Sequence, residues 1–324
     1  MLKKVSAGPL PCGRGSVLSR ARKQVVFGVS LLLFLGAFLA ECQECPVVVG
    51  RARLAYESKK FDTAVAEFRS AVDACGEQPP VLIGLAQSYL MAQKVEDAAR
   101  ILDRVLEIDG RNVTALKLRG DIFYLLGKDE EAETALLRAI QIDHANEPAR
   151  YALGRIYYQL QRYPEAVAQF EEIVARDPKN YRAHDNLALA YDSMNSDDLA
   201  LKHYFAALEL VYKDHPEYDW VYGNLADHYL RLGDYAKAFQ LGAEAAKRNP
   251  ASARNFFLTG KALWNLGKVE QSVRWLKQAE TLDPAYPEPR YVLGQIYRKQ
   301  GDVEASKREL EVFRQLNSNP RPRR

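Results

Sequence analysis

The sequence lacks the short motifs of the common catalytic sites. It has no G-x-S-x-G nucleophile turn, no phosphate-binding glycine loop and no cysteine set at metal-binding spacing. Its five histidines are scattered, and none forms the H-x-x-x-H pair with a glutamate that zinc peptidases use. We therefore expect a protein that is not an enzyme and that needs no metal and no cofactor.

A basic surface is also missing from most of the chain. Six of the 45 Lys and Arg residues, but none of the 42 Asp and Glu residues, lie within residues 1–40. The rest of the chain carries 39 basic residues against 42 acidic residues. Because binding to a phosphate backbone requires an excess of positive charge, we expect no nucleic-acid partner.

Long apolar runs are absent except for one near the N-terminus. Residues 25–40, VVFGVSLLLFLGAFLA, contain no charge, and the basic region 1–24 precedes them. This order predicts a signal anchor in the cytoplasmic membrane, with the rest of the chain on the periplasmic, extracytoplasmic side. A cleaved signal peptide, which would release a secreted protein, stays open, as does a lipid anchor at Cys42, because neither processing site is regular.

A period of 34 residues, with one step of 38, runs through the body of the chain. Small residues recur at eight matching positions: Ala64, Ala98, Ala132, Ala166, Ala200, Ala238, Ser272 and Ser306. A second small set lies twelve residues before them: Ala52, Ala86, Gly120, Gly154, Ala188, Ala226, Gly260 and Gly294. Small residues at these positions let two helix backbones approach closely, so the pattern predicts stacked helix hairpins. Glycines at one shared phase mark the hairpin turns: Gly127, Gly233, Gly267 and Gly301.

Segments such as LGRIYYQLQRYPEAVAQFEEIVARDP closely resemble the tetratricopeptide repeat family over about residues 45–320, in eight repeats. The resemblance implies an all-α fold, a right-handed superhelical α-solenoid with a concave groove, here preceded by an N-terminal hydrophobic helix. We assign the solenoid to residues 41–320 and a basic tail to residues 321–324. Single repeats depart from the family pattern, as at Gly242, where a bulky residue is usual, and at Thr259, where leucine is usual. Four extra residues near 211–218 either lengthen a helix or form a loop.

The cysteines are few, and three of them follow the apolar run. Cys45 precedes the first helix of the first expected hairpin, and Cys75 follows its second helix. Because these two ends lie side by side in an antiparallel pair, we predict a Cys45–Cys75 disulfide, which an oxidising compartment would allow. The alternative is a redox pair of Cys42 and Cys45 in the C-x-x-C spacing of CQEC.

The family resemblance also places certain first-helix positions on the concave wall, as a peptide-binding groove. The aromatic residues there are Tyr56, Tyr124, Tyr151, Tyr158, Trp220, Phe257, Trp264 and Tyr291. The cationic residues are Arg53, Lys117, Arg155, Arg182, Lys261 and Arg298. Asn186 and Asn224 share one phase and resemble the asparagines with which some family members hold a peptide backbone.

These features predict a scaffold that binds a peptide or protein segment in the groove, outside the cytoplasmic membrane. An alternative is an accessory subunit of a cell-envelope assembly or glycan-processing complex, bound through its convex or end surfaces. A third possibility is carbohydrate binding by the groove aromatics. Tyr, Trp and Arg are the side chains that most often anchor protein interfaces, which favours the first hypothesis.

Overall fold

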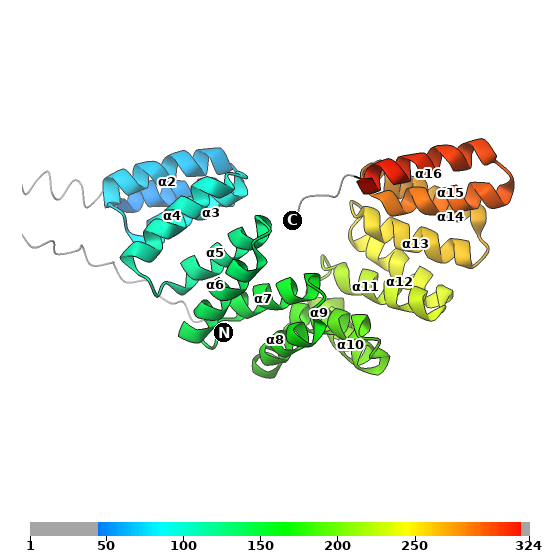
Figure 1. Cartoon of the computed structure of the whole chain (residues 1–324), viewed down its shortest axis with the longest axis horizontal. Coiled ribbons are helices and arrows are strands. Elements are labelled where there is room, and N and C mark those ends of the chain that lie inside the picture. The colour runs from blue at the N-terminus through cyan, green and yellow to red at the C-terminus, as the bar shows by residue number, and fades with distance from the viewer. Residues whose placement is uncertain (1–44, 319–324) are drawn as a thin grey trace, which may run out of the picture. The chain divides into compact units, whose positions relative to one another are not determined.

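The computed structural model describes residues 45–318, and this part of the chain consists of helices joined by short turns, without a strand (Figure 1). Residues 45–57 are helical and precede α2. The helices that follow are α2 Phe61–Cys75, α3 Pro79–Met91, α4 Val95–Ile108, α5 Val113–Leu125, α6 Asp129–Ile142, α7 Glu147–Gln159, α8 Tyr163–Arg176, α9 Tyr181–Ser193, α10 Asp197–Asp214, α11 Trp220–Leu232, α12 Tyr235–Arg248, α13 Ala253–Asn265, α14 Val269–Leu282, α15 Pro287–Gln300 and α16 Val303–Ser318. The predicted all-α solenoid of helix hairpins is thus present in the described residues.

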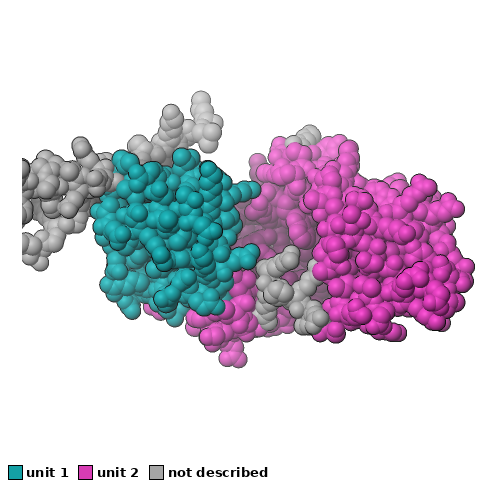
Figure 2. All heavy atoms as spheres, turned by 90° about the horizontal axis from the view of Figure 1, so that it is seen from above, with its two compact units in different colours: residues 1–122 teal, residues 123–324 magenta. Residues whose placement is uncertain are grey.

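The chain divides into two compact units, residues 1–122 and residues 123–324 (Figure 2). In the described part of unit 1, the helix at 45–57 and helices α2 to α5 surround an apolar core that includes Phe68, Leu82 and Leu102. In unit 2, a core that includes Tyr204, Leu225 and Leu258 runs between the hairpins from α9 to α15.

Unit 2 has one layer made of the first helices of its hairpins. Helix α7 contacts α9, α9 contacts α11, α11 contacts α13, and α13 contacts α15. Each of these helices also packs against the second helix of its own hairpin. We call the layer formed by α7, α9, α11, α13 and α15 the first-helix wall.

The small residues of the repeat hold the helices of each hairpin together. A Cβ atom built on Gly154 would lie 2.8 Å from Phe170 Cζ, and one on Gly260 would lie 2.8 Å from Leu276 Cγ. Both distances are shorter than a van der Waals contact, so the bulky residue of the second helix fills the space that glycine leaves. The close approach predicted from the repeat is confirmed at these pairs.

The hairpin turns share one backbone conformation in all eight repeats. The four predicted turn glycines have φ between +74° and +81°. The other four repeats place non-glycine residues at this phase, with φ between +57° and +60°: Lys59, Gln93, Gln161 and Asn195. The turn geometry therefore belongs to every repeat, although glycine marks it in only half of them.

The four extra residues of the long repeat lengthen a helix. Helix α10 has 18 residues, whereas α8 and α12 have 14 residues each. The added turn is anchored by Val211, which is fully buried, and it carries Tyr212, which is 66% exposed. Of the two alternatives that the sequence left open, the loop is therefore wrong for most of the insertion.

The predicted membrane segment, residues 25–40, lies outside the described residues, as do the region 1–24, Cys42 and the tail 321–324. Within residues 45–318, no helix combines the length and the apolar character needed to cross a bilayer.

Candidate functional site

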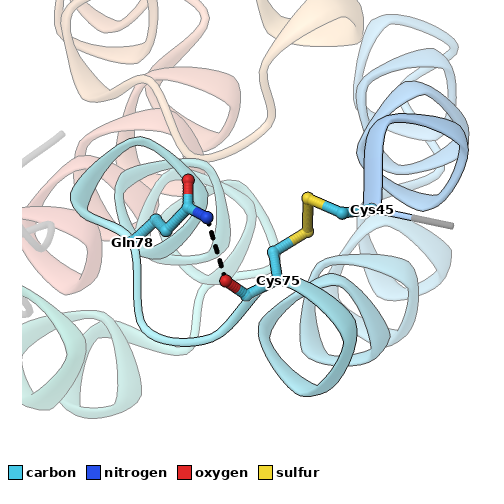
Figure 3. Close-up of a disulfide and its surroundings, with 3 residues drawn as sticks. All are labelled: Cys45, Cys75 and Gln78. Carbon is cyan, nitrogen blue, oxygen red and sulfur yellow. Dashed lines mark hydrogen bonds between the residues drawn. A yellow bond between two sulfur atoms is a disulfide. The ribbon is translucent and has the colours of Figure 1, made fainter. Parts of the chain in front are cut away.

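The structure contains the expected disulfide between Cys45 and Cys75 (Figure 3). The Cα atoms lie 5.1 Å apart, and the bridge joins the first described helical residue to the last residue of α2. Beside it, Gln78 Nε2 donates a hydrogen bond to the carbonyl oxygen of Cys75 at 2.9 Å. Because a loop of about 30 residues is closed, the bridge stabilises the first hairpin by about 3–4 kcal/mol in the chain-entropy account.

Four of the predicted groove residues lie in the N-terminal repeats, in the helix at 45–57 and in α5. Arg53 is exposed, and the ring of Tyr56 lies 5.7 Å from that of Phe61. Lys117 Nζ forms an ion pair with Asp121 Oδ2 at 2.6 Å within α5. Tyr124, at the end of the same helix, is half-buried. These side chains contribute no cluster of exposed aromatic and cationic groups in the described structure.

Helices α7 and α9 bring several predicted groove residues together on the first-helix wall. Asn186 Nδ2 donates a hydrogen bond to the Tyr151 hydroxyl at 2.9 Å. Two turns further along, Ser193 Oγ donates to the Tyr158 hydroxyl at 3.2 Å. Arg155 lies between the two tyrosines in sequence and is exposed. The hydrogen bonds between neighbouring repeats thus fix the positions of both tyrosine rings.

The ionisation of Tyr151 reports the charges around it. Burial raises the pKa of the Tyr151 hydroxyl, while the positive charges of Arg155 and Arg182 lower it. The two arginines come from different helices, and Asn186 links the second of them to Tyr151, because its Nδ2 also donates to the Arg182 carbonyl oxygen at 2.9 Å.

Asn224, unlike Asn186, is buried in the wall. Its Nδ2 donates to Asp185 Oδ1 at 2.9 Å, and Tyr218 donates its hydroxyl to Asp185 Oδ2 at 2.7 Å. Burial raises the pKa of Asp185 to about 6, although the two hydrogen bonds favour the ionised form. Asn186 and Asn224 therefore have different roles, although they share one phase of the repeat. Asn186 donates to a tyrosine hydroxyl, whereas Asn224 donates to a buried carboxyl group.

A second polar cluster follows along the wall. His228 Nδ1 lies 2.9 Å from Asp192 Oδ1, and the Arg231 guanidinium contacts the carboxylates of both Asp192 and Asp197. Burial raises the pKa of Asp192, but hydrogen bonds from His228 and Arg231 outweigh burial and leave the pKa below its ordinary value.

Asp192, Asp197 and His228 are close enough to offer three ligands to one metal ion. The Arg231 guanidinium already occupies the space between the two carboxylates, and a cation would have to displace it. The arrangement is that of an ion-pair network.

Two histidines that are 19 residues apart in the sequence, His184 and His203, lie in contact. The Nδ1 atoms of His184 and His203 lie 3.0 Å apart, and His184 Nε2 lies 3.1 Å from the Pro178 carbonyl oxygen. The carbonyl can only accept, so His184 donates through Nε2, and in its neutral form it accepts from His203 on Nδ1. The view of the histidines as scattered is therefore wrong for this pair.

The predicted residues on α11, α13 and α15 differ in their accessibility. Trp220 is 56% exposed and Tyr291 is 46% exposed, whereas Phe257 is buried in the core. Trp264 lies under the ammonium group of Lys299, 5.0 Å from the ring centroid. The remaining predicted cations are Lys261, which is half-buried, and Arg298, which is exposed.

Sequence reasoning missed the acidic groups that link successive repeats. Asp185 bonds to a residue 39 positions later, and Asp219 accepts from Asn255 Nδ2 at 2.6 Å, 36 positions later. The usable signal is a spacing slightly longer than the 34-residue repeat between an acid, on a first helix or immediately before it, and an amide on the next first helix.

Family models match most of the described chain. Models described as tetratricopeptide repeat match residues 55–122, 148–180 and 180–250, and a model described as TPR repeat matches residues 120–161 and 260–301. No curated protein matches the sequence significantly.

Solved structures share the fold at low sequence identity. A tetratricopeptide repeat protein from Parabacteroides merdae ATCC 43184 is 20% identical, with a TM-score of 0.62, over 83% of this chain and 99% of that chain. PilW is 21% identical, with a TM-score of 0.59, over 66% and 98% of the respective chains. The Cut9–Hcn1 structure is 16% identical, with a TM-score of 0.64, over 80% of this chain and 48% of the other. These structures share the fold, and the repeat models, which together match most of the described residues, show that the chain belongs to the tetratricopeptide repeat proteins.

Proposed function

We propose that this tetratricopeptide repeat protein is a non-catalytic scaffold that binds a peptide or protein segment along the first-helix wall of unit 2. The observation that carries the proposal is the hydrogen-bonded surface at α7 and α9, where Tyr151 and Tyr158 are fixed beside the exposed Arg155. A surface whose side chains are already ordered loses little conformational entropy when a partner binds. Tyr, Trp and Arg are also the commonest anchors of protein interfaces.

The fold supports the same general role. Tetratricopeptide repeat proteins are generally scaffolds for protein–protein interaction. PilW, which shares the fold, is described as a widely conserved type IV pilus biogenesis factor, and Cut9–Hcn1 as a hetero-tetramer of the APC/C. The first description concerns the biogenesis of a pilus and the second a complex of several chains, and we extend only a general role in protein assembly to this chain.

Alanine substitution tests the wall as a binding surface. Replacing Tyr151, Arg155 and Tyr158 together should remove the partners that crosslink to the full chain in native membranes, while far-UV circular dichroism stays unchanged. Because Tyr151 and Tyr158 are partly buried, the surface variant Arg155→Ala/Arg182→Ala provides a second test that does not disturb packing. The same partners, crosslinked equally by both variants, would contradict the proposal.

We also propose that residues 25–40 anchor the chain in the cytoplasmic membrane and that the repeats lie outside the cytoplasm. The apolar run after a basic region supports this topology, and the Cys45–Cys75 disulfide suits an oxidising compartment. Alkaline phosphatase fused after residue 318 should be active, whereas the same enzyme fused after residue 24 should be inactive. The opposite result would exclude this topology.

A second candidate is attachment through an outer surface, as an accessory subunit of an assembly. The supporting observation is the exposure of two aromatic side chains on α10, Phe205 at 48% and Tyr212 at 66%. Crosslinks that map to α10 and not to α7 or α9 would favour this second candidate.

A further inference from the structure

Two arginines on the first-helix wall have no acidic partner among the described residues. Arg155 on α7 and Arg182 on α9 are both exposed. Several other arginines of unit 2, in contrast, pair with carboxylates: Arg162 with Glu133, Arg231 with Asp192, Arg248 with Glu244 and Arg290 with Glu309. The wall therefore presents positive charge that the protein itself leaves without a counter-charge.

Both arginine charges act at one place. Arg155 lies one helical turn after Tyr151 on the same face of α7. Asn186 Nδ2 donates both to the Tyr151 hydroxyl and to the Arg182 carbonyl oxygen, at 2.9 Å each, which brings the backbone of Arg182 close to the same hydroxyl. In agreement with this geometry, both positive charges oppose the rise that burial causes in the pKa of Tyr151. The guanidinium carbon of Arg182 lies 5.6 Å from the centroid of the Tyr181 ring, so a neighbouring aromatic ring supports this side chain. The result is a small cationic surface with a tyrosine hydroxyl at its centre.

The nearest acid does not neutralise this surface. Asp185 also influences the Tyr151 hydroxyl, but it is buried, and its two oxygens already accept hydrogen bonds from Asn224 and Tyr218.

Positive charge continues along the wall towards the C-terminal repeats. Lys261 on α13 and Arg298 on α15 also lack an acidic partner among the described residues. The exposed Asp227 on α11 is accompanied by Arg254, with 3.6 Å between the charged atoms. The wall helices also carry two exposed acids, Glu147 on α7 and Glu288 on α15. These two are fewer than the four cations without an acidic partner, so an occupant of the wall meets more positive charge than negative charge.

We infer that the segment bound by this wall is acidic, with an Asp or Glu carboxylate placed between Arg155 and Arg182 beside Tyr151. This inference rests on the proposed function. A guanidinium offers two parallel N–H donors that match the two oxygens of a carboxylate, and such charge-assisted pairs are stronger than neutral hydrogen bonds. The surrounding positive field also speeds the encounter with a negatively charged chain.

Selection from a random dodecapeptide library, displayed on phage and panned against the full chain, tests the inference. Peptides that bind the wild type should be enriched in Asp and Glu, and their affinity should fall as salt is added. Synthetic copies with an amidated C-terminus should bind equally well if a side-chain carboxylate is recognised. A requirement for a free C-terminus would contradict the side-chain assignment.

Variants separate this inference from the proposed function. Arg155→Ala/Arg182→Ala should weaken the selected peptides at least about tenfold, and Arg155→Glu/Arg182→Glu should select Lys- and Arg-rich peptides instead. Arg274→Glu, a charge reversal at an exposed position of α14, is the control and should change neither result. Peptides that depend on Tyr158 or Trp220 but carry no acidic residue would overturn the inference and leave the proposed function intact. Peptides that depend on no wall residue would overturn both.

Discussion

Thr259 fills the space beside Gly242. A Cβ atom built on Gly242 would lie 2.8 Å from Thr259 Oγ1 and 3.3 Å from the Thr259 backbone nitrogen. In its own helix, Thr259 Oγ1 donates to the Asn255 carbonyl at 2.8 Å and so satisfies its buried hydroxyl. Two departures from the repeat pattern, which look independent in the sequence, therefore form one close contact between α12 and α13.

Restoring the usual bulky residue at position 242 should destabilise the protein. We expect Gly242→Leu to lower the free energy of unfolding by about 1–3 kcal/mol or more, because the side chain has no room against the backbone of α13. Adding Thr259→Ala should recover only part of the loss, because the backbone contact remains.

Denaturant unfolding monitored by circular dichroism measures both variants at position 242. Gly50, which lies in the helix at 45–57 with no atom within 4 Å of a built Cβ, is the matched control. Gly50→Ala should leave stability unchanged or raise it by up to about 1 kcal/mol. A Gly242→Leu variant with the free energy of unfolding of the wild type would contradict the prediction, because it would show that α12 and α13 can move apart without loss of stability.

Substitution at the positive-φ position of the hairpin turns should change stability in a predictable direction. Gln161 and Asn195 adopt the left-handed conformation that non-glycine residues reach only at a cost. We expect Gln161→Gly to raise the free energy of unfolding by about 0.5–1 kcal/mol, and the reverse change Gly127→Ala to lower it by about 1 kcal/mol. Thermal melts of the two variants provide the measurement, and equal shifts in one direction would contradict the assignment.

Loss of the disulfide should weaken the first hairpin. We expect Cys45→Ser/Cys75→Ser to lose about 3–4 kcal/mol relative to the oxidised wild type, because about 30 residues are no longer closed into a loop. The reduced wild type is the control and should match the variant. Mass mapping of non-reduced peptides should recover the Cys45–Cys75 crosslink, and a Cys42–Cys45 pair would disprove it.

The buried carboxyl group of Asp185 should make stability depend on pH. Its pKa is about 6 in the folded protein, against an ordinary value of 3.8. The folded state thus binds the proton more tightly than the unfolded state. The corresponding stabilisation is complete below pH 3.8 and is lost as the pH rises to about 6.

Replacement of Asp185 tests this pH dependence. Between pH 4 and pH 7, the stability of Asp185→Asn relative to wild type should rise by about 2–3 kcal/mol, because the variant has no proton to lose. Urea unfolding at a series of pH values gives the comparison. Tyr218→Phe removes one hydrogen bond to the ionised form and should move the transition to higher pH. Parallel profiles for wild type and Asp185→Asn would refute the assignment.

Much of the fold could be predicted because it depends on residue size at a fixed period. Gly154 against Phe170 is such a case, since a glycine and a ring at constant spacing identify a close helix contact. The pairing of Asp185 with Asn224 could not be predicted in this way, because it depends on the register of two helices that are 39 residues apart. The same limit applies to Phe257, whose burial follows from the packing of its neighbours and not from its position in the repeat.

The extra turn of α10 shows how such an array can grow without losing its register. Four residues add about 6 Å to a helix and rotate its end by only about 40° beyond a complete turn. The following hairpin therefore leaves α10 in almost its former direction, and the next repeats keep their period. An insertion of two residues would rotate the exit by about 200° and point the following hairpin away from the stack. Repeat arrays of this kind should accordingly tolerate length changes in whole helical turns and reject those in between.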